Sequence, residues 1–334
     1  MNKPISLDIA ICTYNNAALL HRALDAIAQQ QVHSEINWRV LIINNNCTDN
    51  TVKVIEKYRQ FGKFKLEMVV ETTQGLTPAR LRGVKEAQGD WVAFIDDDCF
   101  LEADWVEQAA QFIAQHPDCG AYGSRIILDW EVPPPQYAMD CAYSYAQQEH
   151  GDSPKTLGCL VGAGMVIRKQ AIMDCGWCDR TFLADRVGKK LVSGGDVEMA
   201  LRLAATSELW YNPACRLHHY IPEYRLTLPY LYKINFGLGS CKLFGDSMLW
   251  SQSYPSWFLA SCGYGIRDSI KALKYIFYSL KDRKPIANAI VFSIFTCGWW
   301  LGIWRMLWLN PQQRQALVGC AVPQTSFVAT ISEC

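Results

Sequence analysis

Trp-Val-Ala-Phe-Ile-Asp-Asp-Asp, residues 91–98, joins an apolar run directly to three aspartates. The apolar part has the composition of a buried strand, and no turn residue separates it from the acidic part. Three adjacent carboxylates repel one another, so the cluster favours a place where a cation or hydrogen-bond donors offset the repulsion. Such hard oxygen ligands suit Mg²⁺ or Mn²⁺ shared with substrate phosphates. The alternative is a solvated acidic loop that caps the next helix.

The residues around this stretch alternate between strand and helix patterns. Strands are expected at 5–12, 38–43, 65–70 and 120–128, and helices at 17–30, 51–61, 78–87 and 103–115. This alternation predicts an α/β fold with a mostly parallel central sheet flanked by helices. Ligands of such sheets bind at the carboxyl ends of the strands, which is where the polar clusters fall. Thr13-Tyr14-Asn15-Asn16 and Asn44-Asn45-Asn46 are two of these clusters.

The second half has weaker patterns. A strand is expected at 160–168, a helix at 197–205 and a strand that ends near Leu217. Residues 130–153 hold three consecutive prolines and are expected to form a loop region. Several aromatic residues could offer ring faces to a ligand or simply pack: Trp130, Tyr137, Tyr143, Tyr145 and Trp177. The polar segment 181–195, with Arg186, Lys189 and Lys190, is expected to close over the substrates as a lid.

Composition limits the class of protein. Of 334 residues, 50% are apolar and 19% charged, which favours a globular chain with a sizeable core over a disordered one. The 32 basic and 32 acidic residues balance, so no nucleic-acid partner is expected. Fourteen scattered cysteines and the absence of a secretory signal pattern at the N-terminus favour a cytoplasmic location. The pair Cys175 and Cys178 has no second pair at zinc spacing.

The tail needs its own interpretation. Residues 286–304 contain no charged residue and include Trp299, Trp300 and Trp304, and the stretch 271–284 before them is basic and amphipathic. Three structures suit this pattern: a helix on a membrane surface, a helix packed on the protein, and a true span. We expect peripheral association with the cytoplasmic face of a membrane.

A series of motifs resembles those of family 2 glycosyltransferases, which have the GT-A fold. In chain order they occupy 12–15, 43–49, 79–80, 96–98, 162–168, 194–198 with Arg202, and 213–218. Together they span residues 5 to about 225. Within the family, the chain is most similar to cyanobacterial hormogonium-polysaccharide glycosyltransferases, through Gly194-Gly195-Asp196 and residues 218–222.

The resemblance implies a metal-dependent, inverting transfer of a sugar from a nucleoside-diphosphate sugar to a glycan or lipid-linked acceptor in polysaccharide biosynthesis. It assigns the nucleotide sugar to Thr13, Tyr14, Asn15, Asn44, Arg80, Asp96, Asp97 and Gly164. It assigns Mn²⁺ or Mg²⁺ to Asp96, Asp98 and His218, with His219 as a competitor for the histidine position. The chain departs from the family at Asn44, where an aspartate is usual, and at Leu81, where an asparagine is usual.

Sugar transfer also needs a base, because an acceptor hydroxyl is a poor nucleophile at neutral pH. The resemblance assigns this part to Asp196, which is expected to open a helix. A simple helix N-cap is the alternative role for Asp196. Glu198 could orient the acceptor or pair with Arg202, four residues further on.

Two domains are expected: a catalytic GT-A domain at 1–225 and a helical, apolar extension at 226–334. A sugar-phosphate nucleotidyltransferase is one rival, but it would need a glycine-rich phosphate loop, and residues 13–16 hold no glycine. A non-catalytic sugar- or membrane-binding module is another rival. It would leave Asp96, Asp98 and Asp196 without an explanation.

Overall fold

The computed structural model describes residues 4–183, 194–282 and 286–322. The α/β part begins with β1 (Ile5–Thr13), α1 (Ala17–Ala28), β2 (Ile36–Asn44), α2 (Thr51–Phe61), β3 (Leu66–Val70), α3 (Leu76–Glu86), β4 (Trp91–Asp96), β5 (Cys99–Leu101), α4 (Trp105–Gln115) and β6 (Ala121–Trp130). It continues with α5 (Gln136–Asp140), η1 (Ala142–Tyr145), β7 (Lys155–Thr156), β8 (Met165–Arg168), α6 (Lys169–Asp174), α7 (Gly195–Thr206), β9 (Leu209–Ile221) and η2 (Glu223–Leu226). The helices α8 (Leu228–Met248), α9 (Tyr254–Lys281), α10 (Ala287–Trp308) and α11 (Pro311–Leu317) follow. Most of the expected lid, including Arg186, Lys189 and Lys190, lies outside the described residues.

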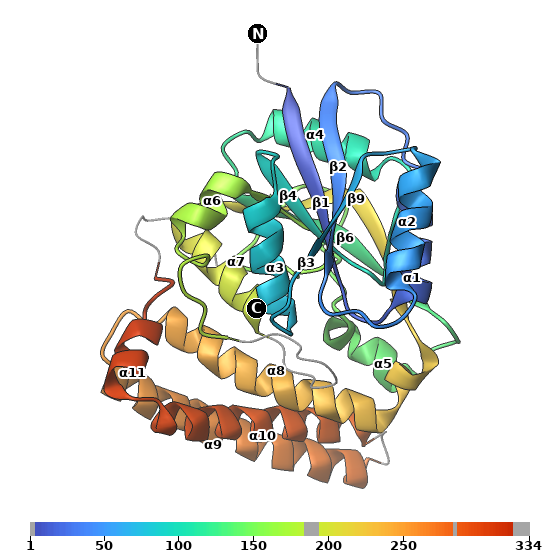
Figure 1. Cartoon of the computed structure of the whole chain (residues 1–334). Coiled ribbons are helices and arrows are strands. Elements are labelled where there is room, and N and C mark those ends of the chain that lie inside the picture. Colours follow the sequence, from blue (N-terminus) through green and yellow to red (C-terminus); the bar gives the residue numbers. More distant parts are fainter. Residues whose placement is uncertain (1–3, 184–193, 283–285, 323–334) are drawn as a thin grey trace.

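One mixed sheet forms the centre of the α/β part (Figure 1). Its order is β3-β2-β1-β4-β8-β6-β9-β5, with β7 added to β9. The first four strands in this order are parallel, as expected. The second half differs, because β8 runs antiparallel to both β4 and β6. A strand buried on both faces has the same apolar pattern in either direction, so the sequence could not predict this reversal.

Apolar layers cover both faces of the sheet. Side chains of α1, α2 and α4 pack with Ile9, Ile42 and other strand residues on one face. Side chains of α3, α6 and α7 pack with Leu41, Phe94 and their neighbours on the other. Helices on both faces of a mostly parallel sheet give the three-layer α/β architecture that the alternating pattern predicts. The expected loop at 130–153 contains two short helices, α5 and η1.

A separate layer of helices lies across the end of the α/β part (Figure 1). α10 packs between α8 and α9, and its backbone touches that of α8. A Cβ atom on Gly298 would lie 2.0 Å from the carbonyl oxygen of Phe236, and one on Gly239 would lie 1.9 Å from the carbonyl oxygen of Phe295. Only glycine permits such a close crossing.

This packing bears on the apolar tail. Among the described residues, α10 is the helix long and apolar enough to cross a membrane, with a mean hydropathy of 1.4 over its best window. Trp299, Ile303 and Met306 are nevertheless buried against the neighbouring helices. Of the three interpretations of residues 286–304, the structure favours the packed helix.

Gly298→Ala is expected to lower the free energy of unfolding by about 1–3 kcal/mol, because the added methyl group must push α8 and α10 apart. Gly263→Ala is the matched control, since a Cβ atom there meets nothing within 4 Å on the exposed side of α9. The control should be neutral or stabilising by about 0.5–1 kcal/mol. Urea unfolding of both variants checks the result, and equal stabilities would contradict the backbone contact between α8 and α10.

Candidate functional site

The carboxyl end of β1 is joined to the aspartate cluster after β4. The hydroxyl group of Thr13 donates to Asp97 at 2.7 Å, and the side-chain amide of Asn16 donates to its other oxygen at 2.7 Å. Burial and the neighbouring Asp98 raise the pKa of Asp97 to about 7. Asp97 therefore holds the two loops together through these hydrogen bonds.

Two asparagines shape the loop beside this junction. The side-chain oxygen of Asn15 accepts from the backbone N–H of Thr48 at 2.7 Å, and Asn15 itself has a φ of 50°. The side-chain oxygen of Asn44 accepts from the backbone N–H of Cys47 at 2.8 Å. Both amides thus bind loop backbone. Tyr14, which precedes Asn15 in the chain, is 43% exposed, so its ring is open to a ligand.

Arg80 and Asp196 meet at one glycine, and Asp96 lies beside Arg80. Arg80, on α3, is 3% exposed and lies 3.8 Å from a carboxylate oxygen of Asp96 at the end of β4. A Cβ atom on Gly162 would lie 2.6 Å from the Arg80 guanidinium and 2.8 Å from Cβ of Asp196. The fold therefore brings together side chains that are up to 116 positions apart in the sequence.

Asp196 lies inside the first turn of α7. The helix begins at Gly195 and its N-cap is Gly194, so the interpretation of Asp196 as the N-cap is wrong. One carboxylate oxygen accepts from the backbone N–H of Val197 at 2.9 Å, and the other from Gly162 at 3.3 Å. These two bonds fix the carboxylate where the positive end of the helix dipole favours its charge.

Glu198 is fully buried and does not face an open site. Its carboxylate pairs with Arg202 at 2.8 Å and accepts from the backbone N–H groups of Phe182 and Leu183. Arg202 also donates to the carbonyl oxygen of Gly176 at 2.9 Å. Of the two roles weighed for Glu198, the structure favours the ion pair with Arg202. The bonds to Phe182 and Leu183 also hold the segment before residue 184 against α7.

Asp98 lies in a buried group with two basic side chains. One carboxylate oxygen is 3.1 Å from the guanidinium of Arg225, and the other is 3.5 Å from Nε2 of His219. Nδ1 of His219 is 2.8 Å from the carbonyl oxygen of Tyr145. Because Nδ1 then carries the proton, Nε2 presents a lone pair toward Asp98 in the neutral ring.

The two adjacent histidines face opposite sides of β9. β9 continues past Leu217 to Ile221, and His219 pairs with Cys99 in the ladder to β5. His218 is 3.3 Å from Glu102 and its side chain is 40% exposed. Successive strand residues point to opposite faces, so only one of them can reach Asp98. That residue is His219, the competitor, and not His218, which the resemblance assigned to the metal.

The donors beside Asp98 suit a divalent cation in part. Asp98, Cys99 and His219 offer atoms within 4.8 Å of one another. Burial and the neighbouring carboxylates raise the pKa of Cys99 well above its ordinary value, so its thiol stays protonated and is a poor ligand. A carboxylate and an imidazole remain, and both are ligands that Mn²⁺ accepts. Arg225 already provides one positive charge here.

Comparison with known proteins decides the family. Residues 8–176, half of the chain, match the model of glycosyl transferase family 2. The chain belongs to glycosyl transferase family 2.

Curated relatives of this family 2 chain share a quarter to a third of its residues over the aligned part. A glucosyl-dolichyl phosphate glucuronosyltransferase of Haloferax volcanii is 26% identical over 177 residues, which cover 52% of this chain and 56% of the relative. A PGL/p-HBAD biosynthesis glycosyltransferase of Mycobacterium bovis is 33% identical over 121 residues, covering 36% of this chain and 46% of the relative. The chain thus spans about half the length of these relatives.

Solved structures show the same fold. The mannosyltransferase PcManGT from Pyrobaculum calidifontis, in complex with GDP-Man and Mn²⁺, superposes with a TM-score of 0.60 at 16% identity, over 91% of this chain and 88% of that chain. Residues 1–349 of TarS from S. aureus, in complex with UDP-GlcNAc, give a TM-score of 0.51 at 15% identity, over 87% and 90%. The family 2 chain therefore has the GT-A fold that the motifs predict.

Gly164 has a structural reason to be glycine in this family 2 chain. Its φ is 72°, and a Cβ atom would lie 2.4 Å from Leu217. Its carbonyl oxygen accepts from the hydroxyl group of Ser124 at 2.8 Å. These contacts join the turn before β8 to β6 and β9. The expected role of Gly164 at the nucleotide sugar stays a prediction.

The aromatic residues divide by exposure. Trp177 and Tyr145 are 0% and 3% exposed, so neither can stack on an acceptor sugar. Tyr143 is 56% exposed and its hydroxyl group donates to Asn235 at 2.8 Å. It is the most open of the five expected acceptor aromatics.

Two partners of Asp98, Arg225 and His219, could be identified only from the structure. Arg225 comes from η2, after the strand with the histidines, and no local pattern in the sequence marks it as a partner of Asp98. If the expected strand had been extended from Leu217 to Ile221, the alternation of side chains along it would have placed His218 and His219 on opposite faces.

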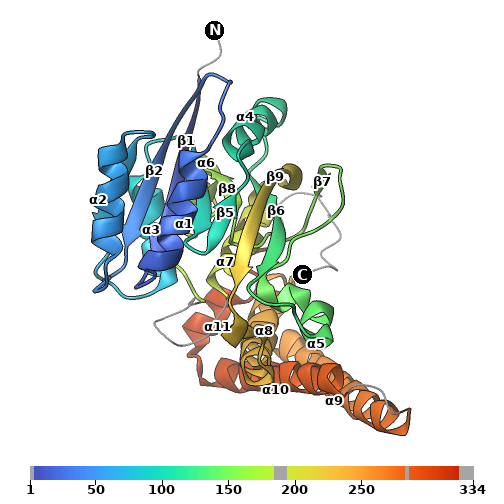
Figure 2. The same cartoon turned by 90° about the vertical axis from the view of Figure 1, so that its right-hand side faces the viewer.

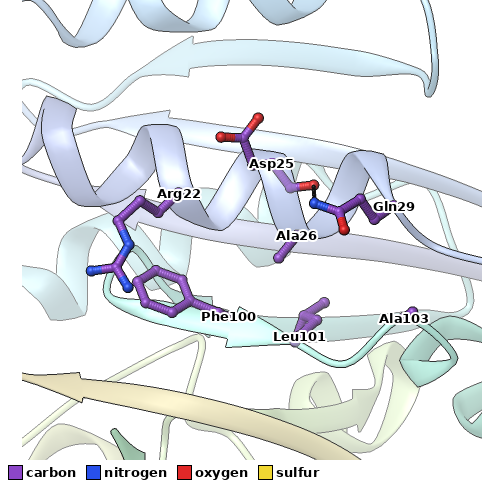
Figure 3. Close-up of a pocket in the computed structure, with 7 residues that line it drawn as sticks. All are labelled: Arg22, Asp25, Ala26, Gln29, Phe100, Leu101 and Ala103. Atoms are coloured by element: carbon purple, nitrogen blue, oxygen red, sulfur yellow. Dashed lines mark hydrogen bonds between the residues drawn. The ribbon is translucent and has the colours of Figure 1, made fainter. Parts of the chain in front are cut away.

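A hollow of about 330 Å³ lies elsewhere, between α1 and β5 (Figure 3). The lining residues are Arg22, Asp25, Ala26, Gln29, Phe100, Leu101 and Ala103. The Arg22 guanidinium lies 4.2 Å from the centre of the Phe100 ring. No predicted site residue lines this hollow.

Proposed function

We propose that this protein transfers a sugar from a nucleoside-diphosphate sugar to the hydroxyl group of a glycan or lipid-linked acceptor. The contact of Arg80 with Asp96, and the meeting of Arg80 and Asp196 at Gly162, carry this proposal. This arrangement places a donor-side carboxylate and a candidate base near the same guanidinium at the carboxyl ends of the strands, where α/β folds bind ligands. The names of the relatives, one of which is a dolichyl phosphate enzyme, support a lipid-linked acceptor.

In the proposed donor site, Tyr14 and Thr13 border the nucleobase, and Asn15 and Asn44 shape the loop that receives it. Arg80 balances the charge of Asp96 near the ribose and diphosphate. Asp97 keeps the ends of β1 and β4 in register through Thr13 and Asn16. Asn44 lacks the negative charge of the aspartate that is usual at this position in the family. Selection between nucleotides must therefore come from other contacts with the nucleobase.

In the proposed reaction, Asp196 takes the proton of the acceptor hydroxyl as that oxygen attacks the sugar. Direct attack from the side opposite the leaving diphosphate inverts the anomeric centre. Asp98 and His219, with Asp96 nearby, would hold Mn²⁺ or Mg²⁺, which supplies positive charge for the departing diphosphate. A structural neighbour named above, PcManGT, holds GDP-Man and Mn²⁺, which supports this choice of partners.

Domain roles and location complete the proposal. Residues 1–225 form the catalytic domain and residues 226–334 a helical extension. The cysteines are scattered along the chain and do not frame short loops, which supports a reducing, cytoplasmic compartment. The narrower resemblance to hormogonium-polysaccharide glycosyltransferases, and with it a role in polysaccharide biosynthesis, stays a prediction.

Incubation with a panel of UDP- and GDP-sugars is expected to give slow hydrolysis of one donor, because water can replace the acceptor hydroxyl. The rate should rise at least about tenfold with Mn²⁺ and return to background with excess chelator. Release of nucleoside diphosphate is the measurement, with heat-denatured protein as the control. Release of pyrophosphate from a sugar phosphate and a nucleoside triphosphate would instead favour a nucleotidyltransferase.

A further inference from the structure

The outer side of helix α9 exposes many large apolar side chains. α9 packs on α10 along one side, where the indole N–H of Trp299 donates to the carbonyl oxygen of Ser261 at 3.0 Å and that of Trp300 to the hydroxyl group of Ser269 at 3.1 Å. After Gly265, Ala272 is the one buried residue up to Lys281. The second half of α9 therefore contacts the rest of the described chain along one narrow side only, and its other sides are open to solvent.

The other side of α9 carries a stripe of large apolar side chains. Its members are Leu259, Ile266, Ile270, Leu273, Phe277 and Leu280, with exposed fractions between 49% and 72%. Leu259 and Ile266 are seven positions apart, and from Ile266 on the members recur every three or four residues. This spacing places them on one face of the helix. A continuous exposed apolar surface of this kind marks a site of interaction with a partner or a membrane.

Positive charge borders the stripe. Arg267 lies 2.8 Å and Lys271 3.8 Å from Asp268, so these two bases share one carboxylate. Lys274 and Lys281 have no acidic partner among the residues that the structure describes. At the far end of α10, Trp304 and Trp308 are 56% and 73% exposed. Apolar, basic and tryptophan side chains together suit the boundary between lipid headgroups and hydrocarbon.

We propose that the outer face of α9 docks on a membrane surface that contains anionic lipid, with the helix lying along it. A second copy of the chain is the competing occupant, but face-to-face pairing would bring the unpaired lysines of both copies to one interface. Anionic headgroups instead balance Lys274 and Lys281. The membrane contact thus falls on α9 and on the exposed tryptophans at the end of α10, and not on the part of 286–304 that packs in the layer, such as Val291, Trp299 and Ile303.

The arrangement of the fold gives this contact a use. The carboxyl ends of β1, β2 and β4 point toward the helical layer (Figure 1), and α9 lies on the side of that layer away from the sheet (Figure 2). A membrane against α9 would therefore lie on the same side of the sheet as the candidate site. Membrane docking does not depend on the transfer reaction, but a lipid-linked acceptor would then be held near the site.

Flotation of the full-length protein with lipid vesicles tests the proposal. At low salt the protein should float with phosphatidylcholine vesicles that contain phosphatidylglycerol, and less with phosphatidylcholine alone or at high salt. The variant Ile270→Glu/Leu273→Glu/Phe277→Glu should bind at least about tenfold more weakly. The control variant Val52→Glu/Phe61→Glu/Val70→Glu changes exposed apolar residues of α2 and β3 and should bind like the wild type.

Charge is tested separately. Lys274→Glu/Lys281→Glu should reduce binding to anionic vesicles by about tenfold or more and leave binding to neutral vesicles unchanged. Lys53→Glu/Lys63→Glu, on the exposed surface of α2 and the loop after it, is the matched control and should have no effect. Donor hydrolysis without vesicles should be the same in all four variants, so a failure to dock is distinct from a failure of catalysis.

Three results would overturn the proposal. One is a wild type that does not float with anionic vesicles at low salt, and another is an α9 variant that binds as well as the wild type. A third is a wild-type dimer in light scattering that the α9 variant converts to a monomer, without vesicle binding by either protein. That result would assign the α9 face to a second copy of the chain.

Discussion

Asp196→Asn is expected to lower the turnover number by about 10²-fold or more while donor affinity changes little. The amide cannot take the proton of the acceptor hydroxyl, but it has nearly the same shape as the carboxylate. One of the two hydrogen bonds, from Val197 or Gly162, can still form to the amide oxygen. The loss of negative charge in the first turn of α7 should cost only about 0.3–1 kcal/mol of stability.

The measurement is steady-state transfer or donor hydrolysis, together with donor affinity by calorimetry and thermal unfolding. Asp104→Asn is a suitable control, because Asp104 is the N-cap residue of α4 and lies outside the candidate site. If Asp196→Asn turns over at nearly the wild-type rate, the base lies elsewhere. If donor affinity falls as much as turnover, Asp196 contacts the donor and is not the base.

Asp98→Asn is expected to abolish measurable activity and to weaken Mn²⁺ binding. From the sequence, removal of one charge from a repelling cluster should leave stability unchanged. The structure changes this expectation, because Asp98 neutralises the buried guanidinium of Arg225. An uncompensated buried charge should lower the free energy of unfolding by about 1–3 kcal/mol.

A second variant separates the two effects. Asp98→Asn/Arg225→Gln removes both charges and should recover most of the lost stability without any recovery of activity. Binding of Mn²⁺, followed by electron paramagnetic resonance in the absence of substrate, should stay weak in both variants. Asp8→Asn is the matched control, since Asp8 forms a buried pair with Arg39 at 2.7 Å near the other end of β1.

The control should lose stability and keep Mn²⁺ binding. Undiminished activity of Asp98→Asn, or undiminished activity in excess chelator, would contradict the metal assignment. Recovery of activity in the double variant would show that Asp98 acts only by neutralising Arg225.

Local sequence predicted most of the first half of the fold. The bounds of α2, Thr51–Phe61, agree with the expected helix, and β1, β2 and β4 fall within two residues of the expected strands. These elements are encoded by apolar periodicity and by polar residues at their ends, which act over a few positions. The grouping of Thr13, Asn44 and Asp96 at one edge of the sheet followed from the alternation of strands and helices.

The tertiary structure alone decided which of these groups meet. The pairing of Cys99 with His219 across two strands selects His219 over His218, and η2 brings Arg225 to Asp98 across 127 positions of sequence. For the tail, composition is the same for a packed helix and a membrane helix. The difference depends on Gly239, almost sixty positions before Gly298, because that glycine lets the two backbones touch. Periodicity records which side of an element is apolar, whereas the partner of that side is set by contacts between distant parts of the chain.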